Sequence, residues 1–258
     1  MDKWTQASIE YANSRNYLDK LYPVYPLLTN RPRTIPHDTW ESVVEAYQER
    51  DNLSLIRHLL KLNLFPIKDS YVSYLRRDPS ALERNPATVR RLAANLYNLN
   101  LEKILEKCEE PKETNRQMGP MFKNWVDNGG LALKPISLKD FEKSTSDAIL
   151  MGSDAEMAQW CTQKLNYPRN KGLDFVGRFN GTYVIGEAKF LTDFGGHQNA
   201  QLEDALATSQ LKNVDAITLA ILDGVVYIRN SGKMYQTITH CESTVLSALI
   251  LSDFLATI

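Results

Sequence analysis

The sequence predicts an α/β (α+β) protein in which a helical N-terminal part is followed by a mixed β-sheet flanked by helices. In the first 110 residues, apolar side chains recur at helical spacing between short turns rich in Pro, Asn and Asp. Further along, two runs rich in β-branched and aromatic residues flank the dipeptide Asn180-Gly181. We therefore expect a helical domain over residues 1–110 and a sheet-containing core over residues 111–258.

Helix-start signals support the helical part. Asp38-Thr39 is expected to cap a helix that ends at Arg50, and Asn52 is expected to cap a second helix through Lys61. Asn85-Pro86 starts a further helix, because proline is tolerated at the first helical position, where no amide donor is needed. Short capped helices of this kind are typical of a small helical domain.

The second part alternates helices and strands. Asp154 is expected to cap a helix that stops near Pro168, before the first β-rich run. A second hairpin is expected around Asp223-Gly224, extending the sheet, and an apolar helix over residues 243–255 closes the chain. Aromatic side chains such as Trp160, and the tyrosines of the first part, are expected in the core and at its rim.

Composition limits the class of protein. The chain has 258 residues, 43% of them apolar, and a net charge of −1, which excludes a disordered or collagen-like chain and binding of nucleic acid by bulk charge alone. No apolar run is long enough for a membrane helix, and the first residues do not resemble a signal peptide. Three widely separated cysteines give no disulfide or zinc pattern, so we expect a cytoplasmic protein.

Positive charge in the helical part comes in pairs. Arg76-Arg77 and Arg90-Arg91 carry it, with Arg84 between them. Such residues form either an ordinary solvated helix surface or a stripe that contacts phosphates, since arginine and lysine along a backbone provide most nucleic-acid affinity. The sequence leaves both interpretations open.

The Asn180-Gly181 turn has a consequence for chemistry. A two-residue turn between Phe179 and Thr182 fixes a register in which Asp174 lies opposite Glu187. Lys189 follows two residues later and therefore shares the face of Glu187. Like charges opposed in this way destabilise a sheet, so either both carboxylates lie on a solvated edge or a cation belongs between them. Mg²⁺ is such a cation, because it prefers oxygen ligands.

These residues carry a resemblance to a known family. Asp174, twelve intervening residues and then Glu187-Ala188-Lys189 resemble the PD-(D/E)XK nuclease motif, with Leu173 where its proline would stand. The glycine-rich loop and polar helix start after Lys189 are similar to those of several type II restriction endonucleases. The resemblance covers residues 152 to about 230 and implies a restriction-endonuclease-like core.

The resemblance implies roles for individual residues. Asp174, Glu187 and the Ala188 carbonyl would hold Mg²⁺ against the scissile phosphate, and Lys189 would orient or help deprotonate a water molecule or stabilise phosphate charge. Glu156 is a further catalytic candidate, because families of this superfamily often place an acidic residue on the preceding helix.

Polar residues in two segments are candidates for contact with double-stranded DNA. One group comes just before an apolar segment with helical spacing, and the other follows Lys189. Both are also ordinary residues for a helix start or a plain loop. The candidates are Arg116, Gln117, Gly196, His197, Gln198 and Asn199.

The resemblance leaves three functions open. The first is a type II restriction endonuclease, which would cut both strands of a symmetric site most simply as a homodimer. The second is another nuclease of the superfamily, of repair, resolvase or transposon-end type. The third is a non-catalytic DNA-binding module.

Overall fold

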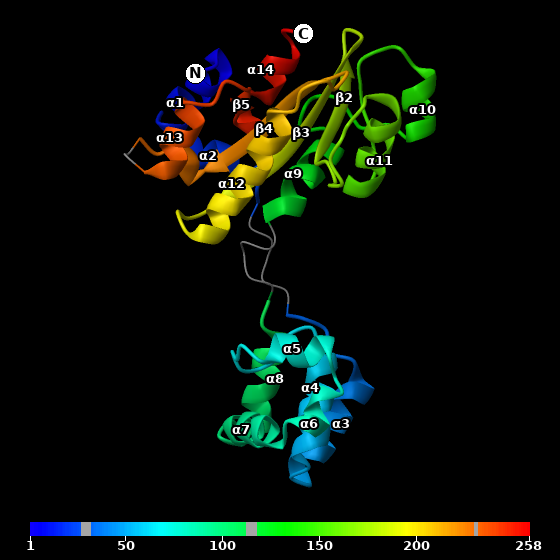
Figure 1. Ribbon diagram of the computed structural model, residues 1–258, viewed down its shortest axis with the longest axis vertical. Coiled ribbons are helices and arrows are strands. Elements are labelled where there is room, and N and C mark those ends of the chain that lie inside the picture. The colour runs from blue at the N-terminus through cyan, green and yellow to red at the C-terminus, as the bar shows by residue number, and fades with distance from the viewer. Residues whose placement is uncertain (27–31, 112–117, 230–231) are drawn as a thin grey trace. The chain divides into compact units, whose positions relative to one another are not determined.

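The computed structural model describes residues 1–26, 32–111, 118–229 and 232–258. The chain divides into two compact units (Figure 1). The sheet unit comprises Met1–Leu27 and Thr114–Ile258, and the helical unit comprises Leu28–Glu113. No helix among the described residues has the length and apolar character needed to span a bilayer.

The first residues of the chain belong to the sheet unit, which differs from the expected division at residue 110. Ile9, Leu21 and Tyr25 are buried in the same core as the strands, and the Ser247 amide donates to Ser8 Oγ at 2.9 Å. The helical unit is therefore an insertion within the sheet unit. Helical periodicity marks a segment as helical but does not say which core buries it.

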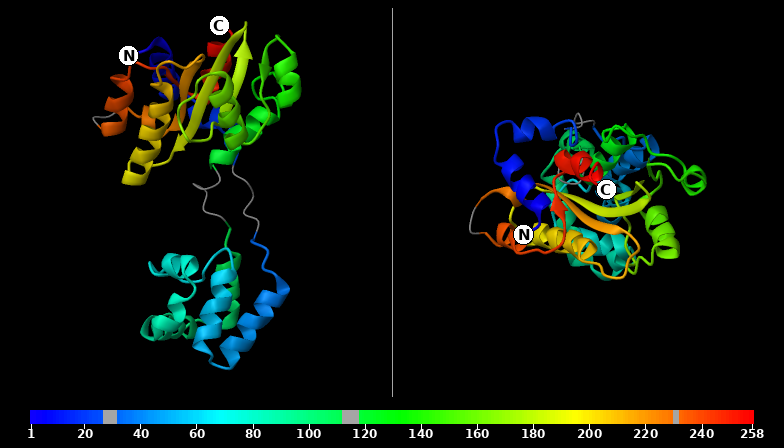
Figure 2. Two further views of the ribbon diagram at one scale, coloured as in Figure 1. Left: turned by 45° about the vertical axis from the view of Figure 1, so that its right-hand side comes forward. Right: turned by 90° about the horizontal axis from the view of Figure 1, so that it is seen from above.

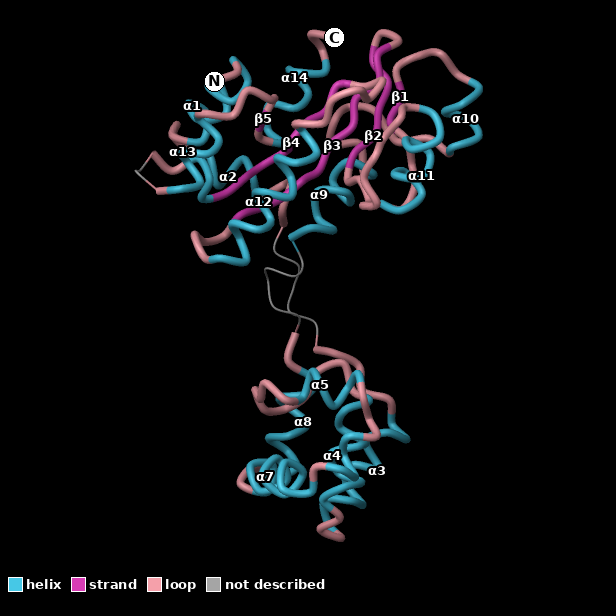
Figure 3. The backbone as a smooth tube through the Cα atoms, in the orientation of Figure 1, coloured by secondary structure: helices cyan, strands magenta, loops and turns pink. Residues whose placement is uncertain are grey.

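The helical unit contains six helices in its described part, three of which, His37–Gln48, Asn52–Lys61 and Pro86–Tyr97, correspond to helices that the sequence predicts (Figure 3). Asp51, one residue before the expected cap, accepts the Leu53 and Ser54 amides, and Pro86 begins its helix as expected. The helices bury a core of their own. Their bounds are α3 His37–Gln48, α4 Asn52–Lys61, α5 Val72–Arg77, α6 Ala81–Arg84, α7 Pro86–Tyr97 and α8 Leu101–Glu109.

The sheet unit has a five-stranded mixed sheet with strand order β1-β2-β3-β4-β5. The first three strands pair antiparallel, and β3, β4 and β5 pair parallel. The architecture confirms the expected α/β (α+β) class. The elements are α1 Lys3–Ala12, α2 Tyr17–Leu21, α9 Met118–Asp127, α10 Leu138–Lys143, β1 Ala148–Ile149, α11 Asp154–Lys164, β2 Phe175–Phe179, β3 Thr182–Leu191, α12 Gly196–Ser209, β4 Ile217–Gly224, the 3₁₀ turn η2 Val225–Tyr227, α13 Lys233–Thr239, β5 Val245–Leu246, η3 Ala248–Ile250 and α14 Leu251–Leu255.

Helices cover both faces of the sheet. The helix α12 packs on one face of β3 and β4, and the N-terminal helices and α14 lie on the other (Figure 2). Because successive strand residues point to opposite faces, β3 presents Ile185 to the cluster that includes α11 and presents Val184 and Ala188 to the core that includes α9. The two faces of β3 therefore pack against two different hydrophobic clusters.

The first hairpin has the register that the sequence predicts. Phe179 pairs with Thr182, and the ladder runs without a slip to the pair Phe175 and Gly186. Asn180 and Gly181 both have positive φ, 46° and 76°, as a two-residue turn of this type requires. A local turn signal was sufficient to align the two strands.

The second expected hairpin is wrong. After β4 the chain forms the 3₁₀ turn η2, and β4 instead pairs with β5. Residues 225–229 have no free sheet edge to join, because β3 and β5 occupy both sides of β4. Gly224 turns the chain with φ of 93°, and a Cβ there would lie 2.1 Å from the Leu191 carbonyl oxygen.

The closing helix is also shorter than expected. The segment expected as one apolar helix over 243–255 contains β5, η3 and α14. Val245 and Leu246 are fully buried next to β4. Pairing with the open edge of β4 provides hydrogen bonds and burial that a longer helix at this position would forgo.

A buried carboxylate joins the N-terminal segment to the sheet. Asp223, at the end of β4, is fully buried and accepts hydrogen bonds from Tyr17 Oη and Tyr25 Oη, both at 3.1 Å. The Ser247 hydroxyl and the Ala248 amide also donate to it. Burial raises the pKa of Asp223 to about 6 despite these donors. The network connects segments that are about 200 residues apart in the chain.

Asp223 should make stability depend on pH. Because its folded pKa is raised from 3.8 to about 6, the protonated carboxyl favours the folded state below pH 4, and this contribution is lost as pH rises through 6. We expect the free energy of unfolding of the wild type, relative to Asp223→Asn, to fall by about 3 kcal/mol between pH 4 and 7.5. Urea unfolding at a series of pH values measures this difference. Parallel pH profiles for the two proteins would contradict it, and Asp193→Asn, in an exposed loop, is the control.

Candidate active site

The hairpin brings Asp174 beside the end of β3. The last pair of the β2–β3 ladder is Phe175 with Gly186, so Asp174 lies just outside β2. The Asp174 amide still donates to the Gly186 carbonyl at 3.1 Å. Its side chain then takes over as acceptor, since Asp174 Oδ2 lies 2.8 Å from the Ala188 amide nitrogen. This bond fixes the carboxylate next to Glu187-Ala188-Lys189.

Lys189 binds the three predicted metal ligands. Its Nζ lies 3.4 Å from Asp174 Oδ2 and 3.0 Å from the Ala188 carbonyl oxygen, and it also donates to Glu187 Oε1. The three oxygen ligands predicted from the sequence therefore converge on one positive charge. Of the two interpretations left open, the cation-binding one describes the geometry, because Glu187 is only 3% exposed and does not lie on a solvated edge.

Burial and charge set the protonation of this group. Burial raises the pKa of Asp174, with Lys189 opposing the rise and Glu187 adding to it. Burial lowers the pKa of Lys189, but Asp174 and Glu187 outweigh it and raise that pKa above its ordinary value. Lys189 therefore carries its proton at neutral pH.

A second lysine holds Glu187. Lys171 Nζ lies 2.8 Å from Glu187 Oε1 and also pairs with Asp204 of α12. Arg169 pairs with the same aspartate at 2.8 Å. Sequence reasoning missed this group, although the basic run Arg169-Asn170-Lys171 just before the motif was a signal. Its partner Asp204 lies more than thirty residues away, so the pairing itself was not visible.

The site fits a hard divalent cation. Glu187 Oε2 is a buried oxygen without a hydrogen-bond partner, while Oε1 of the same carboxylate binds two lysines. Two carboxylates and one carbonyl are the donor set that Mg²⁺ prefers. A further acidic group, His37, Asp38 and Glu41, is fully exposed on the first turn of α3, and exposed groups of this kind do not identify a metal centre.

Glu156 has a helix-capping role in the structure. Ser153 is the N-cap of α11, one residue before the expected cap, and Glu156 completes a capping box with it. Glu156 Oε2 accepts from both the amide and the hydroxyl of Ser153 at 2.7 Å. Asp154, at the start of α11, pairs with Lys123 at 2.6 Å and makes only the smallest contribution to the raised pKa of Asp174, after burial and Glu187.

The loop after β3 leads into α12. Gly195 and Gly196 have open space where a Cβ would stand, so internal packing does not require glycine there. His197 is exposed and Asn199 is half-buried, whereas Gln198 is turned inward and bonds the Thr192 amide and hydroxyl at 3.2 Å. Arg116 and Gln117 lie outside the described residues.

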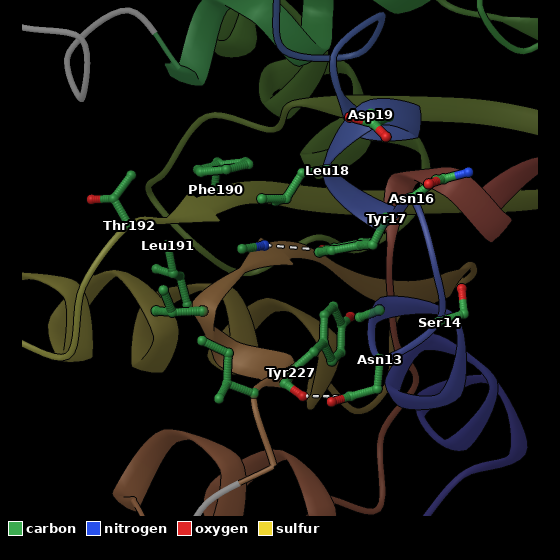
Figure 4. Close-up of a pocket in the computed structure, with 14 residues that line it drawn as sticks. Asn13, Ser14, Asn16, Tyr17, Leu18, Asp19, Phe190, Leu191, Thr192 and Tyr227 are labelled. Atoms are coloured by element: carbon green, nitrogen blue, oxygen red, sulfur yellow. Dashed lines mark hydrogen bonds between the residues drawn. The ribbon is translucent and has the colours of Figure 1, made fainter.

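A separate cavity of about 620 Å³ opens at the C-terminal ends of β3 and β4 (Figure 4). Phe190, Thr192 and Tyr17 line it, and the Tyr17 hydroxyl accepts from the Gly224 amide. Phe190 follows Lys189 in β3 and so points to the other face of the sheet. The cavity is therefore distinct from the carboxylate site.

Comparison with known proteins decides among the three functions. A family model described as Tsp45I type II restriction enzyme matches residues 2–258. No curated protein and no solved structure matches the chain. The match spans both units, so the helical unit is part of the family's chain and not an unrelated addition. It confirms the first of the three functions and the resemblance drawn from Asp174, Glu187 and Lys189. The chain belongs to the Tsp45I type II restriction enzyme family and is a site-specific endonuclease that acts on double-stranded DNA.

Proposed function

We propose that this endonuclease is Mg²⁺-dependent and that Asp174, Glu187 and the Ala188 carbonyl hold the metal. The observation that carries the proposal is the buried, unpartnered Glu187 Oε2 beside the cluster where these oxygens surround the Lys189 ammonium. A buried carboxylate oxygen without a donor costs free energy unless a ligand satisfies it.

The residues of the chain have separate tasks in phosphodiester hydrolysis. Bound Mg²⁺ lowers the pKa of water and offsets the charge that develops on the phosphate. Lys189 holds its proton, because its pKa is raised, and it therefore supplies positive charge and a donor to the reacting phosphate or the attacking water. Lys171 keeps Glu187 Oε1 occupied, which leaves Oε2 as the oxygen available to the metal.

For DNA contact we propose Gly196, His197 and Asn199 at the start of α12, together with Arg116 and Gln117. Glycines that packing does not require allow backbone amides to approach a phosphate. Gln198 contributes indirectly, because its bonds to Thr192 hold the loop. Base contacts from such polar side chains would supply sequence specificity.

We propose a cytoplasmic homodimer. All three cysteines are free and buried, which suits a reducing compartment. A two-fold dimer places one active site on each strand of a symmetric sequence.

Three substitutions test the assignment of the active site. We expect Asp174→Asn and Lys189→Ala to reduce the single-turnover cleavage rate by about 1,000-fold or more, because each removes charge from the reacting centre. Affinity for DNA should change much less in Lys189→Ala. Glu156→Gln should cut at close to the wild-type rate, since glutamine also completes a capping box.

The measurement is incubation of each protein with a long phage DNA, with Mg²⁺ and with EDTA. Discrete fragments that require Mg²⁺ and disappear in Asp174→Asn are expected. Asp193→Asn, which removes an exposed carboxylate from the loop after β3, is the matched control. Wild-type cutting by Lys189→Ala would refute its role, and loss of cutting by Glu156→Gln would place Glu156 in the site.

The oligomeric state is tested by sedimentation. The protomer mass is 29.4 kDa, and we expect a species of twice that mass at micromolar concentration, both free and on a duplex that contains the cleavage site. A single protomer in both conditions would exclude the dimer.

A further inference from the structure

The helical unit has an exposed surface that combines aromatic and basic side chains. We define the α5–α7 face as Tyr71, Tyr74, Arg77, Arg84, Arg90 and Arg91. The family match does not assign a role to any of these residues.

Two tyrosines on this face do not lie where the sequence suggested. Tyr71 and Tyr74 are 59% and 60% exposed, whereas Trp160 is buried as expected. Spacing of three residues places Tyr71, Tyr74 and Arg77 along the outer side of α5, opposite the buried Val72 and Leu75. These rings therefore contribute little to the core and remain available to a partner.

Arginines flank both rings. The Arg91 guanidinium lies 5.4 Å from the centre of the Tyr71 ring. Arg84 pairs with Asp78 at 2.6 Å, and its pKa is raised chiefly by Asp78, with a small contribution from Tyr74. Tyrosine beside arginine is a combination that suits the backbone of a duplex, because the hydroxyl and the guanidinium both donate hydrogen bonds to phosphate oxygens.

The segment that contains this face carries excess positive charge. Residues 57–91 contain eight Lys and Arg but three Asp and Glu. Each of the three acids already pairs with an arginine, Asp69 with Arg91, Asp78 with Arg84 and Glu83 with Arg57. The excess positive charge on the segment is therefore not neutralised within it.

The arginine pairs seen in the sequence divide into two kinds. Arg76 donates to the Leu62 and Asn63 carbonyls at 2.7 and 3.3 Å and so caps the end of α4. Arg77 and Arg90 are exposed and form no ion pair with any described residue. A structural role thus accounts for Arg76 but not for these two.

The opposite charge lies elsewhere in the same unit. Helix α3 carries Asp38, Glu41 and Glu45 and has no lysine or arginine. A unit with one basic side and one acidic helix presents a preferred side to a polyanion. The basic residues favour a negatively charged partner over an apolar protein surface. Among negatively charged partners, DNA is favoured over an acidic protein because DNA is the family's substrate.

We propose that the α5–α7 face binds the DNA backbone, so that the helical unit contacts the same duplex that the sheet unit cuts. Arg77, Arg90 and Arg84 contact phosphates, and Tyr71 and Tyr74 pack against the sugar-phosphate backbone beside them. The contact adds affinity without reading sequence. This proposal rests on DNA as the substrate and does not depend on Mg²⁺ or on the residues of the active site.

The test measures DNA affinity of the full chain by fluorescence anisotropy in EDTA. The probes are a 30-base-pair duplex that contains the cleavage site mapped from the phage digest and one of equal length that lacks it. We expect Arg77→Gln/Arg90→Gln to weaken binding to both duplexes by about tenfold and to reduce the slope of log affinity against log salt by about 2. Tyr71→Ser/Tyr74→Ser should also weaken binding to both duplexes.

Control variants make the result specific. Lys103→Gln/Lys107→Gln removes the same charge from α8 and should leave affinity and salt slope close to wild type. Circular dichroism should show unchanged thermal unfolding for each double variant. Cleavage at saturating DNA with Mg²⁺ should proceed at the wild-type rate in Lys103→Gln/Lys107→Gln.

Several outcomes would overturn the proposal. If Arg77→Gln/Arg90→Gln had the same DNA affinity and the same salt slope as the α8 control variant, phosphate contact by this face would be refuted. If Arg77→Gln/Arg90→Gln instead shifted the sedimentation profile from dimer to monomer, while the dimer that still formed bound DNA with wild-type affinity, the face would be a protein interface. Failure of Mg²⁺-dependent cleavage in the wild type would refute the proposed metal chemistry. The comparison of the variants on a 30-base-pair duplex of arbitrary sequence would still test the α5–α7 face, because the expected contacts do not read sequence.

Discussion

The positive charge of Lys189 between Asp174 and Glu187 is the interaction on which the site depends. Two carboxylates brought together at the end of a hairpin repel each other, and burial deepens that cost. Lys189 offsets it with bonds to both side chains and to the Ala188 carbonyl. Lys171 and Asp204 extend the arrangement onto α12. The two lysines therefore hold the Glu187 side chain in place and also neutralise its negative charge.

The strand β3 separates this charged site from a second buried network. Its side chains point alternately to the two faces, so Glu187 and Lys189 lie with α11 and α12, while Ala188 and Phe190 lie with the N-terminal helices. On that second face, Asp223 binds Tyr17, Tyr25 and Ser247. This network holds the first 25 residues of the chain against the sheet, which makes them part of the unit that contains Asp174, Glu187 and Lys189. The insertion of the helical unit after them does not disturb the hairpin.

Charge is unevenly distributed within the helical unit, and this suits a site-specific enzyme. A net charge of −1 weakens binding to DNA at random, while basic residues gathered on one segment of the helical unit provide local attraction. Phosphate contacts position a protein without reading sequence, so specificity in such an enzyme requires separate contacts to the bases.

The sequence by itself determined the first hairpin and the side chains that converge beside its end. Asn180-Gly181 restricts the backbone locally, and strand alternation then places Asp174, Glu187 and Lys189 together without further information. Helices of the helical unit were also predictable, because apolar spacing is a local signal, but their caps were displaced: Pro36 and not Asp38-Thr39 precedes α3, and Asp51 and not Asn52 caps α4.

Tertiary structure decided the rest. It determined that residues 1–27 join the sheet unit, that β5 and not residues 225–229 pairs with β4, and that Lys171 binds Glu187. Each of these outcomes depends on which distant segment packs into a core, pairs with a sheet edge or supplies the opposite charge. Glu156 resembled a catalytic acid in sequence, but its carboxylate is used by Ser153. Local patterns set the conformation of a segment, whereas competition between distant segments for the same edge or charge sets its partner.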